Sequence, residues 1–260
     1  MMRTALGCWT AVLFLPLAAG PAAAKVKTME TTIKSGGEEV KAFLAEPEGK
    51  GPFPAIVVIQ EWWGLNDWIK KNAERLAAKS YVCLAPDLYH GKVTDDPAVA
   101  GQLAKGLPHD RALGDLKAAV NKLAHMENVS KDEIGVIGWC MGGGYALQLA
   151  LNDKRVKACA MCYGRVVTAA DDLKPLNATV LGIFGEEDRG IKPEDVRKFE
   201  AALKEAGKEV AGIHIYKNAG HGFMRPSNGP DKENPAYNEE GAKDAWKQID
   251  TFFAKTLKGK

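Results

Sequence analysis

The stretch from Ile134 to Ala150 constrains the fold of this chain more than any other part of the sequence. It begins with apolar residues typical of a short strand, passes through glycines on either side of Cys140, and continues with the spacing of a buried helix. The stretch therefore predicts a strand, a tight turn and a helix, with a thiol at the apex of the turn.

Gly138, Cys140 and Gly142 form the pattern G-x-C-x-G, which is typical of a nucleophile elbow with cysteine in place of the usual serine. Glycine is expected two residues away on each side because a larger side chain would collide with the crossing chain. Unpaired N–H groups at the first turn of a helix favour the thiolate, the form that attacks carbonyl groups. Alternatively, Cys140 is only a small apolar residue, and the glycines only let the helix pack closely on the sheet.

The first 24 residues have the composition of a secretory signal peptide. Arg3 is followed by an apolar stretch from Ala5 to Leu17 and by the small residues Ala22 to Ala24. We expect cleavage after Ala24, one domain over residues 25–260, and export to the periplasm or the medium. No later stretch is long and apolar enough to cross a bilayer, so we expect no membrane association after cleavage.

Composition and cysteine positions exclude several classes of protein. The 260 residues carry a formal net charge of +2, so nothing indicates binding to nucleic acid. Cys83 and Cys159 lie in apolar strand-like runs, as buried free thiols do. Cys159 and Cys162 have the spacing of a redox pair or of half a zinc site, but they lack the helix start of a redox motif and no second metal pair follows. We therefore expect no metal site.

Strand-like and helical patterns alternate along most of the chain. Hydrophobic residues make up 46% of the sequence, enough for one sizeable core. The expected strands are Thr28 to Lys34, Val40 to Ala45, Ala55 to Gln60, Tyr81 to Ala85, the run before Cys140, Val156 to Tyr163, Val180 to Phe184 and Ala211 to Tyr216. The expected helices are Asp67 to Lys79, one from Pro97, Asp110 to Met126, the one after Cys140, Pro193 to Ala206 and Glu239 to Thr256. This order predicts an α/β fold with an eight-stranded, mostly parallel sheet flanked by helices.

Polar residues follow four of the predicted strands, namely Glu61, Cys140, Asp188 and His221. Ligands of open parallel sheets bind at the carboxyl ends of the strands, so these four side chains are candidates for one site. The chain order of nucleophile, acid and histidine is that of α/β-hydrolases. We therefore expect a single-domain α/β-hydrolase fold with a Cys-His-Asp triad.

In this arrangement His221 would hold or remove the thiol proton of Cys140 and later protonate the leaving alcohol, while Asp188 would fix the imidazole tautomer. The backbone N–H groups of Met141 and Trp62 are expected to hold the oxyanion, where removing one donor typically lowers the rate by about 100-fold or more. The predicted chemistry is nucleophilic acyl transfer.

Several motifs resemble those of the dienelactone hydrolase family and occur in the same order. They are Gln60 to Asn66, Pro86 to Tyr89, Gly138 to Gly143, Tyr163-Gly164, Asp188 and His221 to Phe223. The resemblance implies a carboxylic ester hydrolase with a Cys-Asp-His triad, an acyl-cysteine intermediate and no cofactor. It also implies that Glu61 lies close to the cysteine and holds or accepts its proton until substrate binds.

The family's type enzyme opens a lactone bearing a carboxylate, which it holds with two arginines. Arg225 matches one of them, whereas Lys92 stands near the position of the other and lacks the planar fork that grips a carboxylate. We expect small esters or lactones as substrates, with Arg225, Tyr89 and Lys92 in contact with them. We also expect a monomer.

Other interpretations stay open at the level of sequence. The same triad would cleave thioesters or amides, because an oxyanion hole serves all acyl transfers. A ligand-binding protein of the same fold without turnover is a second alternative, and a thiol–disulfide protein using Cys159 and Cys162 is a third. Glu186 and Glu187 are alternatives to Asp188 as the acid, although the spacing from the preceding strand favours Asp188.

Overall fold

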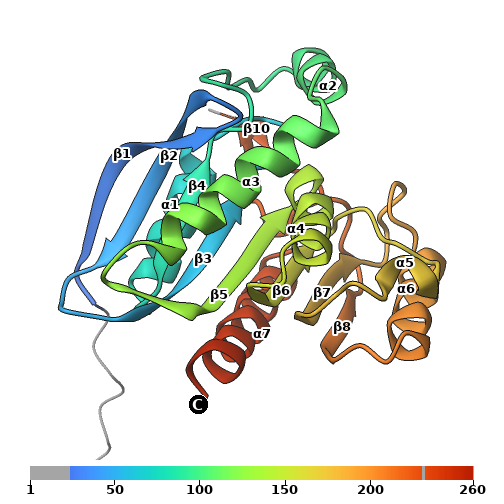
Figure 1. Ribbon diagram of the computed structural model, residues 1–260. Coiled ribbons are helices and arrows are strands. Elements are labelled where there is room, and N and C mark those ends of the chain that lie inside the picture. The colour runs from blue at the N-terminus through green and yellow to red at the C-terminus, as the bar shows by residue number, and fades with distance from the viewer. Residues whose placement is uncertain (1–23, 230–231, 260) are drawn as a thin grey trace, which may run out of the picture.

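The computed structural model describes residues 24–229 and 232–259 of the chain (Figure 1). The strands of its main sheet are β1 (Val26–Ser35), β2 (Glu38–Pro47), β3 (Phe53–Ile59), β4 (Val82–Pro86), β5 (Val129–Trp139), β6 (Val156–Cys162), β7 (Thr179–Gly185) and β8 (Val210–Tyr216). The helices are α1 (Asp67–Ala77), α2 (Pro97–Lys105), α3 (His109–Ala124), α4 (Met141–Asn152), α5 (Ala170–Leu173), α6 (Pro193–Glu205) and α7 (Glu239–Lys258). The predicted leader lies outside the described residues except for Ala24, so the signal peptide and export stay predictions.

The eight strands form one sheet in the order β1-β2-β4-β3-β5-β6-β7-β8. The β1–β2 and β2–β4 pairs are antiparallel, and every pair from β4 through β3 to β8 is parallel. Ile56 and Val57 on β3 face opposite sides of the sheet, and both are fully buried, as expected for a central parallel strand. The predicted eight-stranded, mostly parallel sheet is confirmed.

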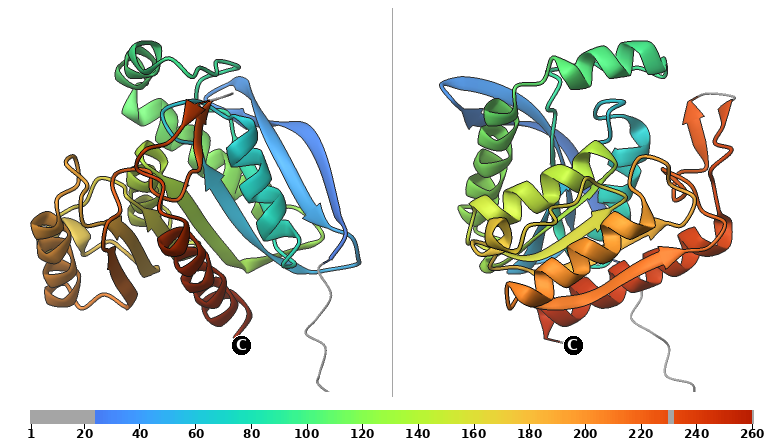
Figure 2. Two further views of the ribbon diagram at one scale, coloured as in Figure 1. Left: turned by 180° about the vertical axis from the view of Figure 1, so that it is seen from behind. Right: turned by 90° about the vertical axis from the view of Figure 1, so that its right-hand side faces the viewer.

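Helices cover both faces of the sheet. Buried residues of α3, α4 and α6 join one apolar cluster, and those of α1 and α7 join the other. Figure 1 shows α3 and α4 in front of the sheet, whereas the view from behind in Figure 2 shows α1 and α7. Each face of the sheet thus has its own apolar core, which leaves the strand ends free to carry the site. None of the described helices is long and apolar enough to span a membrane.

Side-chain caps set the beginnings of two helices near the strand ends. Asn66 accepts a hydrogen bond from Ile69 N at 3.2 Å and starts α1, directly after the turn that follows β3. Asp96 accepts from Ala98 N at 2.7 Å with Pro97 as the first helical residue of α2. The cap at Asn66 confines the turn between β3 and α1 to a few residues.

Two elements of the structure were absent from the predicted order. The single-turn helix α5 is one, and the other is a hairpin of β9 (Ser227–Gly229) and β10 (Lys232–Glu233) within the predicted loop 224–238. Lys232 forms an ion pair of 2.9 Å with Asp95, and Asn234 donates to the carbonyl oxygens of Gly222 and Arg225. The described residues between His221 and α7 are therefore held by an ion pair with a distant part of the chain and by hydrogen bonds within the segment, which local sequence patterns do not report.

Candidate active site

Cys140 occupies the sharp turn between β5 and α4. Its backbone has φ 55° and ψ −119°, a conformation that costs a non-glycine residue about 1–3 kcal/mol. A Cβ on Gly138 would lie within 3.0 Å of the Gly142 backbone, and one on Gly142 would lie within 3.0 Å of the Ile59 and Gln60 backbone. Both glycines are thus required by close backbone approach, as the G-x-C-x-G pattern predicted.

The structure brings Cys140, His221 and Asp188 together from the ends of β5, β8 and β7. His221 Nε2 lies 3.0 Å from Cys140 Sγ, and His221 Nδ1 donates to Asp188 Oδ2 at 2.7 Å. The other carboxylate oxygen of Asp188 accepts from the backbone N–H groups of Gly190 and Ile191 at 2.8 and 2.9 Å. Asp188 is fixed by three donors, so the orientation of the imidazole is also fixed.

Burial and hydrogen bonding act in opposite directions on the two ionisable partners. For His221, burial disfavours the imidazolium, but hydrogen bonds to Asp188 and Cys140 outweigh it and raise the pKa to about 10. For Asp188, burial favours the neutral acid, but the hydrogen bond from His221 and the backbone donors outweigh it and lower the pKa below its ordinary value. Both shifts favour the ion pair of an imidazolium and a carboxylate.

Two backbone donors flank the thiol. Met141 is the first residue of α4, and Trp62 lies in the turn after β3. Gly142 of α4 packs against the end of β3, which brings this turn close to α4. Within residues 24–229 and 232–259, neither of these two N–H groups has a hydrogen-bond acceptor. The N–H of Met141 lies at a helix start, where unpaired N–H groups attract negative charge, and the N–H of Trp62 has no acceptor among the described residues, so both remain candidates for an oxyanion hole.

Glu61 and Arg225 form a buried ion pair near His221. Arg225 Nη1 donates to Glu61 Oε2 at 2.9 Å, and the two side chains are 7% and 3% exposed. The guanidinium also lies over the ring of Trp63, 5.4 Å from its centre, and its Nε donates to the carbonyl oxygen of Ser227. Burial raises the pKa of Glu61 although the Arg225 cation opposes this shift. No hydrogen bond joins Glu61 to Cys140 in the described part of the chain.

The two other predicted substrate contacts lie at different depths. Tyr89 is buried, and its hydroxyl donates to Met141 Sδ at 3.3 Å, so it reaches the first residue of α4. Lys92 is exposed, and its side chain forms no ion pair within the described residues. The structure thus places Tyr89 near the thiol and leaves Lys92 at the surface.

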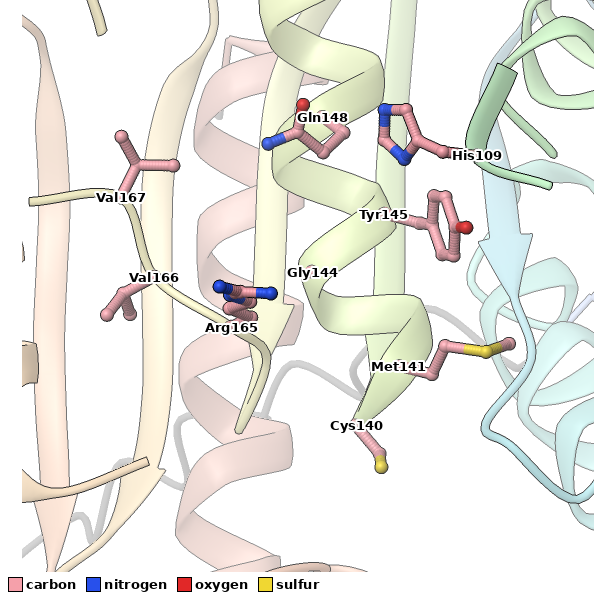
Figure 3. A pocket seen from close by; sticks show the side chains of 9 residues that line it. All are labelled: His109, Cys140, Met141, Gly144, Tyr145, Gln148, Arg165, Val166 and Val167. Atoms are coloured by element: carbon pink, nitrogen blue, oxygen red, sulfur yellow. The ribbon is translucent and has the colours of Figure 1, made fainter. Parts of the chain in front are cut away.

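A pocket of about 430 Å³ opens beside Cys140 (Figure 3). Its lining residues are His109, Cys140, Met141, Gly144, Tyr145, Gln148, Arg165, Val166 and Val167. Sequence reasoning missed Arg165, although its place directly after Tyr163-Gly164 at the end of β6 is a signal that could have found it. Among the described residues, no cluster of three or more histidine, cysteine or acidic side chains could hold a metal ion.

Comparison with known proteins gives the family. A family model described as "Dienelactone hydrolase family" matches residues 40–257. The chain belongs to the dienelactone hydrolase family. The resemblance noted in the sequence is thereby confirmed, and the chain is an enzyme, a hydrolase of the dienelactone hydrolase type, with an α/β-hydrolase fold.

Relatives and solved structures agree with this family. A protein of Methylorubrum extorquens assigned as a carboxymethylenebutenolidase is 32% identical over 228 residues, which span 82% of this chain and 76% of the relative. One of Synechocystis sp. with the same assignment is 31% identical over 250 residues, spanning 90% and 98%. A crystal structure from Klebsiella pneumoniae, assigned as a dienelactone hydrolase, is similar with a TM-score of 0.79 and 29% identity, covering 89% of this chain and 99% of that one.

Proposed function

We propose that this member of the dienelactone hydrolase family cleaves small carboxylic esters or lactones through Cys140, His221 and Asp188. The observation that carries the proposal is the pair of contacts made by His221, 3.0 Å to the thiol and 2.7 Å to the carboxylate. A nucleophile, a base and a third group that orients the base are the parts of an activated nucleophile. The assignment of two relatives as carboxymethylenebutenolidases supports an ester or lactone as the substrate.

The proposed reaction proceeds in two steps through an acyl-cysteine. The thiolate of Cys140 attacks the carbonyl carbon, and the N–H groups of Met141 and Trp62 donate to the oxyanion. His221 gives its proton to the leaving alkoxide as the C–O bond breaks. Water then attacks the acyl-cysteine and gives a proton to His221, the C–S bond breaks, and the acid leaves while the thiolate and the imidazolium are restored.

The remaining predicted residues have narrower roles in this proposal. Tyr89 lies beside Met141 and is placed to contact the bound ester. Arg225 would have to exchange Glu61 for a substrate carboxylate before it could bind one. The predicted exchange of a proton between Glu61 and Cys140 would likewise require Glu61 to leave Arg225, so both roles stay predictions.

The initial rate of p-nitrophenyl acetate hydrolysis by the wild type, Cys140→Ala and Cys159→Ala tests the proposal. We expect Cys140→Ala to be slower by about 1,000-fold or more, because the nucleophile is gone. Cys159→Ala removes a fully buried thiol far from solvent and should retain activity. A transient acetyl adduct on Cys140, measured by mass spectrometry after rapid acid quench, is expected in the wild type and in Cys159→Ala but not in Cys140→Ala.

Two results would contradict the proposal. Equal rates for the wild type and Cys140→Ala would exclude this thiol as the nucleophile. A folded, reduced wild type that binds esters without hydrolysing them would favour the ligand-binding alternative. Faster turnover of a thioester or amide than of the matching ester would instead identify thioesters or amides as the substrate class, with the same acyl-transfer chemistry.

A further inference from the structure

The pocket beside Cys140 has one charged side chain among its lining residues, Arg165. Val166 and Val167 form an apolar side of this pocket, and Met141 lies at its Cys140 end (Figure 3). No lining residue is acidic, and within the described residues the side chain of Arg165 makes no hydrogen bond or ion pair. The rest of the lining includes the polar side chains of His109, Tyr145 and Gln148. A pocket with an apolar side and a single cation is suited to a ligand that has an apolar chain and one anionic group.

Packing on α4 fixes where Arg165 stands. Arg165 comes two residues after Tyr163, which is fully buried and whose N–H donates to Ile183 O. A Cβ on Gly144 would lie 3.4 Å from Arg165 N, so the arginine backbone lies directly against the first turns of α4. Arg165 is exposed, but the backbone that carries it is held next to the elbow.

The side of the triad on which this pocket lies indicates which half of an ester it would hold. Cys140 and Met141 line it, whereas His221 lines a separate hollow together with Asp188 and Arg189. In the proposed reaction the acyl group becomes bonded to the thiol, and the alcohol leaves from the side of His221, which protonates it. The acyl half therefore extends into the pocket with Arg165, and the alcohol half lies toward the hollow with Arg189.

We propose that this pocket is an acyl subsite for half-esters of dicarboxylic acids, with Arg165 binding the free carboxylate. The inference rests on the proposed ester hydrolysis and adds the class of acyl group to it. A guanidinium binds a carboxylate through charge-assisted hydrogen bonds, often two in parallel. Of the two cations predicted from the sequence, Arg225 is engaged by Glu61 and Lys92 does not line this pocket.

Kinetics with a matched pair of esters test the subsite. Mono-p-nitrophenyl adipate carries a terminal carboxylate, and p-nitrophenyl hexanoate has the same chain length without the charge. For Arg165→Gln we expect kcat/KM to fall by about 10-fold for the adipate, mainly through KM, and to change by less than about twofold for the hexanoate. Because the guanidinium is exposed, the preference for the adipate should weaken at high salt.

Arg189→Gln is the matched control, because it removes the same charge from the hollow on the His221 side. It should leave the ratio of adipate to hexanoate turnover near the wild-type value. Arg165→Glu should go further and reverse the preference in favour of a p-nitrophenyl ester whose acyl chain ends in a trimethylammonium group. An unchanged ratio in Arg165→Gln, or an equal loss in Arg189→Gln, would overturn the assignment.

A binding measurement separates this inference from the proposed function. Calorimetric titration of monoethyl adipate into Cys140→Ala needs no turnover, and the affinity should fall by about 10-fold when Arg165→Gln is added. If the wild type hydrolyses no ester while this difference persists, the carboxylate site stands and the hydrolytic function fails. If esters are hydrolysed but the affinity does not depend on Arg165, the subsite fails alone.

Discussion

At the scale of single residues, His221 is the group on which the proposed chemistry depends. It joins Cys140 to Asp188, and its side chain is still 41% exposed although Asp188 beneath it is fully covered. The Tyr163 ring packs against the imidazole in a T-shaped arrangement, with the two ring centres 5.3 Å apart. An imidazole that is oriented by buried groups and open on its other side can exchange protons with a thiol and with water.

The shifted pKa of His221 predicts how pH changes stability. The folded state raises this pKa from 6.5 to about 10, so the fold binds the proton more tightly than the unfolded chain does. The stabilisation is fully present below about pH 6.5 and is lost as pH rises through about 10. We therefore expect the difference in unfolding free energy between wild type and His221→Gln, measured with urea, to shrink between neutral and strongly alkaline pH.

Asp188 supplies the control for that experiment. Its pKa is lowered, so its contribution is present above its ordinary value of 3.8 and is lost as pH falls. The difference between wild type and Asp188→Asn should accordingly shrink on the acidic side. A His221→Gln difference that is constant from neutral to alkaline pH would contradict the shift.

Glu61 and Arg225 act as one unit in the folded chain. The sequence predicted that Glu61 exchanges a proton with Cys140 and that Arg225 contacts the substrate, yet their side chains form one buried pair. Removing one partner of such a pair leaves the other charge buried and unpaired, which typically costs about 3–5 kcal/mol. The pair therefore has a structural role in addition to any catalytic one.

At the scale of elements, the elbow works because β5 and α4 approach β3 without side chains between them. Cys140 N donates to Cys162 O at 3.0 Å, which ties the apex of the turn to the end of β6. The backbones of Gly142 and of residues 59–60 touch directly, so the thiol and Trp62 are held in a fixed relation. A strained backbone at Cys140 persists because contacts on both sides of it define its position.

Two alanine substitutions in α4 test this account of the elbow. Gly142→Ala should lower the unfolding free energy by about 3 kcal/mol or prevent folding, because its Cβ would meet backbone carbonyls that cannot move aside. Gly144→Ala places its Cβ at an ordinary 3.4 Å from Arg165 N and replaces a poor helix former, so stability should be unchanged or slightly higher. Urea denaturation measures both; equal stability of the two variants would contradict the close approach.

At the scale of the whole molecule, the sheet and its two helix layers determine which thiols are exposed to solvent. Cys83, Cys159 and Cys162 are fully buried within the sheet, and all are free, whereas Cys140 is partly exposed at the strand ends. Burial raises the pKa of Cys159 to about 12 and raises those of the other two buried thiols as well. Among the four cysteines that the structure describes, the fold therefore shields three from solvent and leaves one accessible.

Titration with a thiol reagent tests this separation in the chain without its predicted leader. We expect one thiol to react quickly in the folded protein and four to react in denaturant without reductant, because the barrier is burial rather than pairing. In Cys140→Ala the fast reaction should disappear. Two missing thiols in the denatured protein would indicate a disulfide and favour the thiol–disulfide alternative involving Cys159 and Cys162.

The sequence by itself determined the order of the eight strands of the main sheet and of the helices other than α5, the elbow at Cys140 and the chain order of Cys140, Asp188 and His221. These depend on local patterns: apolar runs, glycine spacing and polar residues at strand ends, which report what a short segment of backbone must do. The strands β1 to β8 and the contact of His221 with Cys140 and Asp188 followed from them.

Only the tertiary structure decided which distant groups share a partner. It paired Arg225 with Glu61, ordered the β9–β10 hairpin through Asp95, and placed Arg165 in the pocket beside Cys140. Each of these depends on how segments far apart in the chain pack against one another, and no local spacing encodes that. The competition between burial and charge at Glu61 likewise arises only once the chain has folded.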